Sequence, residues 1–210
     1  LEQLEGLRKR MVTDIAHELR TPLTNLRGYF EGLTDSVVPP SKETFAMLEA
    51  ETLRLVHLVD DLQQLSKADA AGAFLQLCKV SVCDLIEQVT PLFAPRFLGR
   101  NVSFDVDIEP SDIQLMADFD KLLQVLSNLL ENALHYTPEG GQVVVLARER
   151  GQLVEFEISN TGVRIAENDL PFIFERFYRA DRSRSREKGG AGIGLAIVKE
   201  IVEAHGGQVE

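Results

Sequence analysis

The first third of the chain carries two hydrophobic stripes at helical spacing. Apolar residues between Leu4 and Leu33 fall on one stripe, which predicts a single long helix over residues 1–33. Residues 34–41 interrupt this pattern with Val-Val-Pro-Pro, and we expect a second helix to begin near Ser41. The apolar positions of the second helix keep the spacing of a coiled-coil seam, with Thr52 filling one gap. They are Phe45, Leu48, Leu55, Val59, Leu62 and Leu65.

Two antiparallel helices with one stripe each cannot enclose a hydrophobic core on their own. The simplest solution is a second copy of the chain, so the sequence predicts a homodimer that forms a four-helix bundle. Residues 66–73 are small and show no periodicity, which indicates a linker or hinge. We therefore expect a helical domain over 1–67, a linker over 68–73 and a second domain over 74–210.

The pattern changes after the linker, because short alternating runs now interleave with helical ones. Strands are expected at 102–108, 142–150 and 152–159, with a hairpin around Gly151, and helices at 82–97, 119–135 and 193–205. Residues 160–194 form a long stretch with little periodicity, which is typical of a functional lid or a disordered loop. The predicted fold class is therefore α+β and multidomain: a helical hairpin followed by a mixed α/β domain.

The composition is that of a folded protein, with 44% hydrophobic and 26% charged residues. A formal net charge of -11 argues against a main role in binding nucleic acid, because phosphate neutralisation requires an excess of Lys and Arg. No run approaches the ~20 apolar residues of a membrane-spanning helix, and the first residues do not resemble a signal peptide. We expect a soluble, cytoplasmic chain in which Cys78 and Cys83 are buried apolar side chains.

One polar cluster lies on the first helix, where the sequence reads His17-Glu18-Leu19-Arg20-Thr21-Pro22. Helical geometry places His17 away from the apolar stripe and Thr21 one turn above it. The Glu18 carboxylate can hold the proton on one ring nitrogen and leave the other as a nucleophile. Pro22 favours a kink beside the histidine. Taken alone, the hexapeptide is equally compatible with an ordinary surface histidine in a charged helix.

A second cluster lies on the helix predicted over 119–135, where Asn128 and Asn132 stack one turn apart. Asparagine is a poor residue for a helix interior, so a pair on one face requires an explanation. An amide oxygen can ligate Mg²⁺ while nucleotide phosphates supply the negative charge. The alternative is a pair of amides that hydrogen-bond a neighbouring loop. We expect Asp118 to cap this helix, and His205 to be a cation at the C-terminal end of the last helix.

A third cluster is the glycine-rich segment 189–194, immediately before the last predicted helix. Glycines let backbone N–H groups approach an anion, and a helix N-terminus favours negative charge. A preceding basic run strengthens the match to a triphosphate ligand, although a solvated loop has the same composition. The basic residues are Arg179, Arg182, Arg184, Arg186 and Lys188.

Five motifs in order carry a specific resemblance. They are His-Glu-Leu-Arg-Thr-Pro, Asn-Leu-Leu-Glu-Asn-Ala, Ser-Asn-Thr-Gly, Ile-Phe-Glu-Arg-Phe-Tyr-Arg and Gly-Ala-Gly-Ile-Gly-Leu-Ala-Ile. Together they resemble the H, N, G1, F and G2 boxes of sensor histidine kinases, over nearly the whole chain. The resemblance implies a dimerisation and phosphoacceptor hairpin over about residues 1–67, followed by an ATP-binding α/β sandwich of the type shared with type II topoisomerases.

The resemblance also implies roles for single residues. His17 would be phosphorylated from ATP with Glu18 as its acid–base partner, and Thr21 would position water when the same surface dephosphorylates a partner. Asn132 would ligate Mg²⁺, and Phe174 and Phe177 would anchor the lid. The implied nucleotide-binding residues are Asn128, Asn132, His135, Tyr136, Asn160, Gly162, Arg179, Lys188, Gly190, Gly192, Gly194 and Leu195.

The partner implied by the resemblance is the receiver domain of a response regulator, which accepts the phosphoryl group on an aspartate. The full-length protein would be a sensor anchored in the inner or plasma membrane through an N-terminal region, with this chain as its cytoplasmic portion. The chain stops at Glu210, so the family's closing β-hairpin is expected to be absent from it.

The sequence departs from the family pattern around the nucleotide site. Asn160 replaces an aspartate that accepts a hydrogen bond from adenine, at a cost of about 1 kcal/mol. Arg164 replaces the second glycine of its box, and we expect it to occupy a position that suits glycine. His135 stands where Lys or Arg is common. Asn160 and Arg164 motivate one alternative to a kinase, a non-catalytic dimeric signalling scaffold with a degenerate nucleotide site. A third reading, a switch dominated by phosphatase activity in which Thr21 matters more than His17, need not exclude the kinase.

Overall fold

The computed structural model describes residues 2–71, 75–180 and 192–210. The chain divides into two compact units. The first, here called the hairpin unit, comprises Leu1–Leu65 with Glu175–Ile193, and the second, the sheet unit, comprises Ser66–Phe174 with Gly194–Glu210. Each unit is described by itself below.

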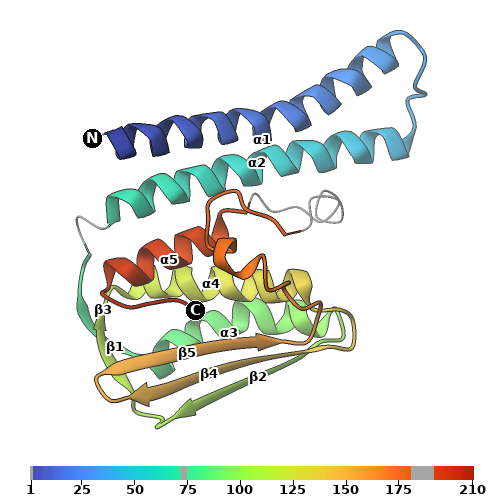
Figure 1. The fold of residues 1–210 in the computed structure, drawn as a ribbon. Helices are drawn as coiled ribbons and strands as arrows, with labels where there is room; N and C mark the ends of the chain where they lie inside the picture. Colours follow the sequence, from blue (N-terminus) through green and yellow to red (C-terminus); the bar gives the residue numbers. More distant parts are fainter. Residues whose placement is uncertain (1, 72–74, 181–191) are drawn as a thin grey trace. The chain divides into compact units, whose positions relative to one another are not determined.

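The hairpin unit is built on two long antiparallel helices, α1 (Glu2–Thr34) and α2 (Lys42–Ala71) (Figure 1). Both were predicted from their stripes. In the connection, the Val37 and Val38 N–H groups donate to the Gly32 carbonyl oxygen. A Cβ on Gly32 would lie 2.7 Å from Val38 Cγ2, so the turn leaves no room for a larger residue. The Thr44 N–H donates to Ser41 Oγ over 3.2 Å, which confirms Ser41 as the start signal of α2.

α2 continues through Ala71 and so extends into the predicted linker over 68–73. The reason is visible in the sequence from Ser66 to Ala71, which contains alanines, a lysine and an aspartate but no glycine or proline. Small side chains remove the apolar period without lowering helix propensity, and alanine has the highest propensity of all. Loss of periodicity was therefore a poor signal for the end of this helix.

The stripe of the second helix is only partly covered within one chain. Leu48 is buried as predicted, and Leu55 and Leu62 are half-buried. In contrast, Phe45 is 57% exposed and Val59 is 45% exposed. On α1 the pattern is similar, since Leu23 and Phe30 also remain exposed. The apolar residues left open on both helices are what a single copy of the hairpin cannot bury.

The sheet unit is a two-layer α/β arrangement with three helices over one face of a three-stranded sheet (Figure 1). Strand β4 is central, parallel to β2 and antiparallel to β5. The β4–β5 turn contains Gly151 at φ +68°, as the sequence predicted. The predicted strands and helices are all present within two residues of their expected bounds. They are β2 (Ser103–Glu109), β4 (Gln142–Arg150), β5 (Leu153–Asn160), α3 (Val82–Leu98), α4 (Phe119–Tyr136) and α5 (Gly194–Ala204).

Three short elements were not predicted. Strands β1 (Cys78–Ser81) and β3 (Gln114–Ala117) form a separate antiparallel pair, and η1 (Leu170–Phe172) is a single 3₁₀ turn in the long loop. Four residues carry too few alternations to be recognised from hydrophobicity. The pair matters for the site, because β1 leads into α3 and β3 leads into α4.

The core of the sheet unit orients α4. Val143, Val145 and Ala147 point from β4 toward the helices and are fully buried. Leu126 and Leu130 of α4 pack in the same cluster. Burial of each such aliphatic side chain contributes about 1.5–3 kcal/mol, which fixes the rotation of α4 about its axis. The polar residues of the helix are therefore held away from the sheet.

Two single-residue expectations are corrected by the structure. Cys78 is exposed and Cys83 is half-buried, so neither is a fully buried apolar side chain, and both are free thiols. His205 is not a helix-terminal cation, because its Nε2 accepts a hydrogen bond from the Asp118 N–H over 3.0 Å. A protonated ring would have no acceptor there. Among the described residues, no helix combines the length and the apolar composition needed to cross a bilayer.

Candidate functional site

His17 lies on α1 with its side chain exposed, while Ile15 is half-buried. The Thr21 hydroxyl donates to the His17 carbonyl oxygen over 3.4 Å, so Thr21 does lie one turn above the histidine. α1 continues through the buried Pro22 without interruption. Proline has no N–H, so the carbonyl of Glu18 lacks its usual helical donor. The Glu18 side chain lies outside the described residues.

The α4 helix begins at a cap of the predicted type and presents its asparagines near α5. Asp118 Oδ1 accepts the Lys121 N–H over 3.2 Å. Asn128 and Asn132 are both half-buried. Buried Asn128 Nδ2 has no hydrogen-bond partner among the residues that the structure describes. Such an atom costs about 1–3 kcal/mol unless a ligand or water supplies an acceptor.

The N-terminus of α5 faces this orphaned amide. The helix starts at Gly194, where a Cβ would lie 3.8 Å from Asn128 Oδ1. Leu195 follows and is half-buried. Unpaired N–H groups at a helix N-terminus attract anions, and the helix dipole adds to the attraction. An amide donor without an acceptor beside a helix N-terminus fits a ligand that carries phosphate oxygens.

A second glycine is fixed by backbone geometry within the hairpin unit. Gly192 has φ +71°, and a Cβ there would lie 2.7 Å from the Tyr178 carbonyl oxygen. The Phe177 N–H donates to the Gly192 carbonyl oxygen over 2.8 Å, and Phe177 itself has φ +63°. The Arg179 Cγ lies 3.2 Å from the same virtual Cβ. The predicted phenylalanine motif and glycine loop are thus in direct backbone contact. Lys188 and Gly190 lie outside the described residues.

The loop after β5 packs against the end of α4. A Cβ on Gly162 would lie 2.7 Å from the Tyr136 carbonyl oxygen and 3.2 Å from Asn160 Nδ2. Asn160 is the last residue of β5, and its Nδ2 donates to the Thr161 carbonyl oxygen over 3.5 Å. The half-exposed Tyr136 ring forms a T-shaped contact with the His135 ring, with 4.7 Å between the ring centroids. The structure therefore brings Asn160, Gly162 and Tyr136 together.

Arg164 does not occupy a position that requires glycine. The non-glycine residues with positive φ in the described part of the chain are Ser36, Asn101 and Phe177. The Arg164 side chain is exposed. The substitution adds a solvated side chain and no backbone strain, which corrects the expectation drawn from the sequence.

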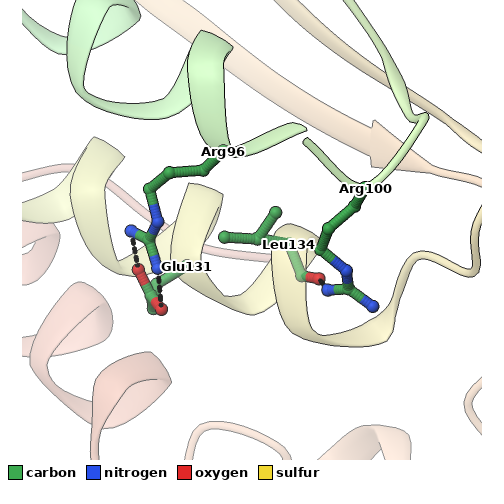
Figure 2. A network of polar contacts seen from close by, with 4 residues as sticks. All are labelled: Arg96, Arg100, Glu131 and Leu134. Atoms are coloured by element: carbon green, nitrogen blue, oxygen red, sulfur yellow. Dashed lines mark hydrogen bonds and ion pairs between the residues drawn. The ribbon is translucent and has the colours of Figure 1, made fainter. Parts of the chain in front are cut away.

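Two arginines that sequence analysis did not single out contact the C-terminal half of α4. Figure 2 shows the Arg96 guanidinium paired with both carboxylate oxygens of Glu131, at 2.7 and 2.8 Å. This pairing raises the pKa of Arg96 above its ordinary value, and the guanidinium also lies over the Phe93 ring at 5.2 Å. Arg100 donates to the carbonyl oxygens of Leu134 and Thr137. The sequence contains little indication of these contacts, because it shows only that Arg96 and Arg100 lie four residues apart and that Glu131 precedes Asn132.

The predicted site residues fall in both units. Asn128, Asn132, His135, Tyr136, Asn160, Gly162, Gly194 and Leu195 belong to the sheet unit. His17, Thr21, Arg179 and Gly192 belong to the hairpin unit. No group of three or more His, Cys, Asp or Glu side chains in the described residues could hold a metal ion.

The chain matches two families of known proteins. Residues 7–71 match the His Kinase A phospho-acceptor domain, and residues 117–210 match the histidine kinase-, DNA gyrase B- and HSP90-like ATPases. The signal transduction histidine-protein kinase BaeS of Escherichia coli is 40% identical over 209 residues, which is 100% of this chain and 44% of BaeS. The sensor histidine kinase WalK of Bacillus subtilis is 36% identical, over 99% of this chain and 35% of WalK. The chain spans about half or less of such relatives.

A solved structure agrees with these matches. The histidine kinase AdeS of Acinetobacter baumannii superposes with a TM-score of 0.68 and 29% identity, covering 90% of this chain and 86% of AdeS. Both matched domains, the relatives along the whole chain and the fold point to one family. The chain belongs to the sensor histidine kinases of two-component systems.

Proposed function

We propose that this chain binds ATP with Mg²⁺, phosphorylates its own His17 and transfers the phosphoryl group to an aspartate of a response regulator. The observation that supports the proposal is that one chain contains both a candidate phosphoacceptor and a candidate phosphate-binding site. One is the exposed His17 on α1, and the other is the orphaned Asn128 amide at the N-terminus of α5. Family membership adds the order of the two reactions.

The first step requires a neutral imidazole. The lone pair of His17 Nε2 attacks the γ-phosphorus, the bond from that phosphorus to the β,γ-bridging oxygen breaks, and ADP leaves. Glu18 holds the proton on Nδ1 and neutralises the positive charge that develops on the ring. In the second step, a carboxylate oxygen of the receiver aspartate takes the phosphoryl group, and the bond from phosphorus to Nε2 breaks.

We assign the nucleotide to the surface formed by α4, the start of α5 and the loop after β5. Within the sheet unit, Asn160 and Tyr136 would bind the base, while Asn128, His135 and Gly194 would bind the phosphates, with Leu195 next to Gly194. The phosphate contacts that the resemblance implies for Arg179, Lys188, Gly190 and Gly192 stay predictions, because these residues belong to the hairpin unit or lie outside the described residues. Asn132 would hold Mg²⁺, which neutralises phosphate charge when it is bound.

We further propose that the chain acts as a homodimer. The support is the apolar surface that one hairpin leaves open, including Phe45, Val59, Leu23 and Phe30. An exposed seam of this kind on two antiparallel helices is covered when a second hairpin completes a four-helix bundle.

The response regulator is proposed as the partner because phosphotransfer defines two-component systems. The histidine kinase ThkA, whose fold matches with a TM-score of 0.81 at 23% identity over 98% of this chain and 57% of ThkA, was solved in complex with the response regulator TrrA. A phosphatase activity on the same partner is proposed for Thr21, whose hydroxyl lies one turn above His17. Loss of receiver dephosphorylation in Thr21→Ala, with autophosphorylation retained, is the expected result.

We also propose that the full-length protein is a membrane-anchored sensor, of which this chain is the cytoplasmic portion. The support is that the chain covers 44% of BaeS and 35% of WalK, so the relatives hold other segments. Fractionation of cells that express the full-length protein should place it with the membrane, and recovery in the soluble fraction would contradict this assignment.

The deciding experiment is incubation of the chain with Mg²⁺ and γ-labelled ATP. The native protein should acquire a label that is stable in base and labile in acid, as a phosphohistidine is, and His17→Gln should acquire none. His57→Gln is the matched control, because His57 is the other histidine of the hairpin, and it should label like the native chain. A label that persists in His17→Gln would refute the assignment of the acceptor.

The scaffold alternative makes the opposite prediction for the nucleotide. It was motivated by Asn160 and Arg164, and the exposed side chain of Arg164 now weighs against a blocked site. A folded dimer that binds no ATP at millimolar concentration in the presence of Mg²⁺ would favour the scaffold over the kinase.

A further inference from the structure

A polar junction in the sheet unit joins segments that are far apart in the sequence. Asp118, which precedes α4, is only 8% exposed. Its Oδ1 accepts the Lys121 N–H over 3.2 Å, and its Oδ2 accepts the Gln76 N–H over 3.0 Å. Its own N–H donates to His205 Nε2 over 3.0 Å. His205 directly follows α5, so the residue at the end of one helix is tied to the cap of another.

The hydrogen bonds define the protonation of the histidine. Nε2 accepts from a backbone N–H and therefore carries no proton. Nδ1 lies 2.7 Å from the Ile201 carbonyl oxygen, which can only accept, so the proton is on Nδ1. The ring is neutral, and both of its nitrogens are used. Each nitrogen fixes a different neighbour: Nδ1 closes the end of α5, and Nε2 reaches across to α4.

The junction lies at the opposite end of both helices from the proposed nucleotide site. α4 runs from Asp118 toward Asn128, while α5 runs from Gly194 toward His205, and the two helices pack side by side (Figure 1). At the far end, Gly194 lies against Asn128. Helices are stiff along their axis, so an axial shift of α5 at His205 moves the first turn of α5, about 15 Å away, by nearly the same distance.

We infer that His205 is a positioning residue for nucleotide binding. By accepting the Asp118 N–H, it sets the axial position of α5 along α4 and so places the α5 N-terminus against Asn128. The inference rests on the proposed function, because it takes ATP to be the ligand at that end of the helices. Gln76 extends the junction to the segment that leads into β1, so the same carboxylate also anchors the chain as it enters the sheet unit.

Two substitutions separate the two roles of the ring. The amide oxygen of a glutamine reaches the position of Nε2, so His205→Gln can still accept the Asp118 N–H. An asparagine is shorter and reaches only the position of Nδ1. His205→Asn can therefore still donate to the Ile201 carbonyl oxygen but loses the link to α4. A third variant, Val102→Ala, removes buried apolar atoms between α3 and β2 and controls for general loss of stability.

The experiment is a titration of the whole chain with ATP in the presence of Mg²⁺, combined with autophosphorylation rates and thermal unfolding. His205→Asn should weaken ATP binding by about tenfold, as loss of one positioning hydrogen bond allows, and should raise KM with kcat nearly unchanged. His205→Gln should bind ATP within about threefold of the native chain. Val102→Ala should unfold at a lower temperature and bind ATP as the native chain does.

The outcomes separate this inference from the proposed function. A native chain that binds no ATP would refute the proposed function itself. A native chain that binds ATP, together with a folded His205→Asn that binds it equally well, would overturn the positioning role. Equal weakening in the Gln and Asn variants would overturn the role of the Nε2 acceptor. Should His205→Asn fail to fold, the ¹⁵N spectrum of the native histidine decides: the Nδ1–H tautomer is expected, and the Nε2–H tautomer would overturn the junction.

Discussion

At the scale of single residues, Asn128 and Gly162 have opposite roles in the proposed nucleotide site. Asn128 Nδ2 is buried with no hydrogen-bond partner in the described part of the chain, so it lacks an acceptor. Gly162 has no space at all, because a single added carbon would meet the Tyr136 carbonyl oxygen at 2.7 Å. A ligand could supply the acceptor that Asn128 lacks, whereas Gly162 keeps the loop after β5 close to the end of α4.

Gly162→Ala should therefore damage nucleotide binding. The methyl group must push the loop after β5 away from the end of α4, at a cost of about 1–3 kcal/mol. We expect ATP affinity to fall about tenfold or more, measured by titration, because Asn160 and Tyr136 are displaced together. Gly28→Ala is the matched control: nothing lies within 4 Å of its virtual Cβ, so it should leave ATP binding unchanged and stabilise α1 slightly. Equal ATP affinity in both variants would contradict the packing argument.

At the scale of elements, α4 is held from several directions. Its apolar face is buried against the sheet, and Asp118 caps its first turn. Arg96 and Arg100 form hydrogen bonds with its last turns (Figure 2). The asparagine face remains between these supports. These contacts restrain the two ends and the apolar face of α4 and leave the face that carries Asn128 and Asn132 free to contact the proposed ligand.

The Arg96–Glu131 pair should make a measurable contribution to this restraint. Both side chains are about half exposed, at 47% and 56%, so the coupling should be only about 0.5–1 kcal/mol. A double-mutant cycle with Arg96→Ala and Glu131→Ala, measured by chemical unfolding, tests this value. The Arg150–Glu155 pair on the sheet is the control, since its single contact at 3.0 Å should couple more weakly. A coupling no larger than that of the control would show that the bidentate geometry adds nothing.

The sequence predicted elements well and junctions poorly. Helices such as α4, and strands such as β4, were located because their apolar residues keep one period over many positions. The bounds of β1 and β3, and the end of α2, could not be found, because four-residue strands and alanine-rich helix ends carry no period. Motif residues were placed correctly on their elements, including His17 and Gly194. The Asp118–His205 junction was hidden, because a hydrogen bond between distant residues leaves no local pattern.

At the scale of the whole molecule, the hairpin remains incomplete as a single copy. The second stripe was predicted to be a seam, and Phe45 and Val59 are exposed within one chain. The chain exposes other apolar side chains as well, such as Leu153 on the edge of the sheet unit at 66%. The exposed apolar residues of the hairpin lie along two long antiparallel helices, so they form a surface that an identical helix pair can match.

Val59→Glu should convert the protein into a monomer. A carboxylate buried at the centre of a four-helix bundle without a partner is strongly unfavourable, so dissociation is the expected response. Light scattering at micromolar concentration should give half of the native mass. Leu153→Glu changes an apolar position outside the hairpin that is more exposed, at 66% against 45% for Val59, and it should leave the dimer intact. A native chain that scatters as a monomer, or a Val59→Glu variant that remains a dimer, would refute the four-helix bundle.

The unequal cysteines make the protein suitable for observing motion between its parts. Cys78 is exposed at the first residue of β1, where the chain has just entered the sheet unit. Partial burial, and to a lesser extent a hydrogen bond to Glu87, raise the pKa of the Cys83 thiol and lower its share of reactive thiolate at neutral pH. A maleimide dye should therefore attach selectively at Cys78 in the native sequence. Paired with a second dye on α1, it would report through fluorescence transfer whether the distance between the two units changes when ATP is added.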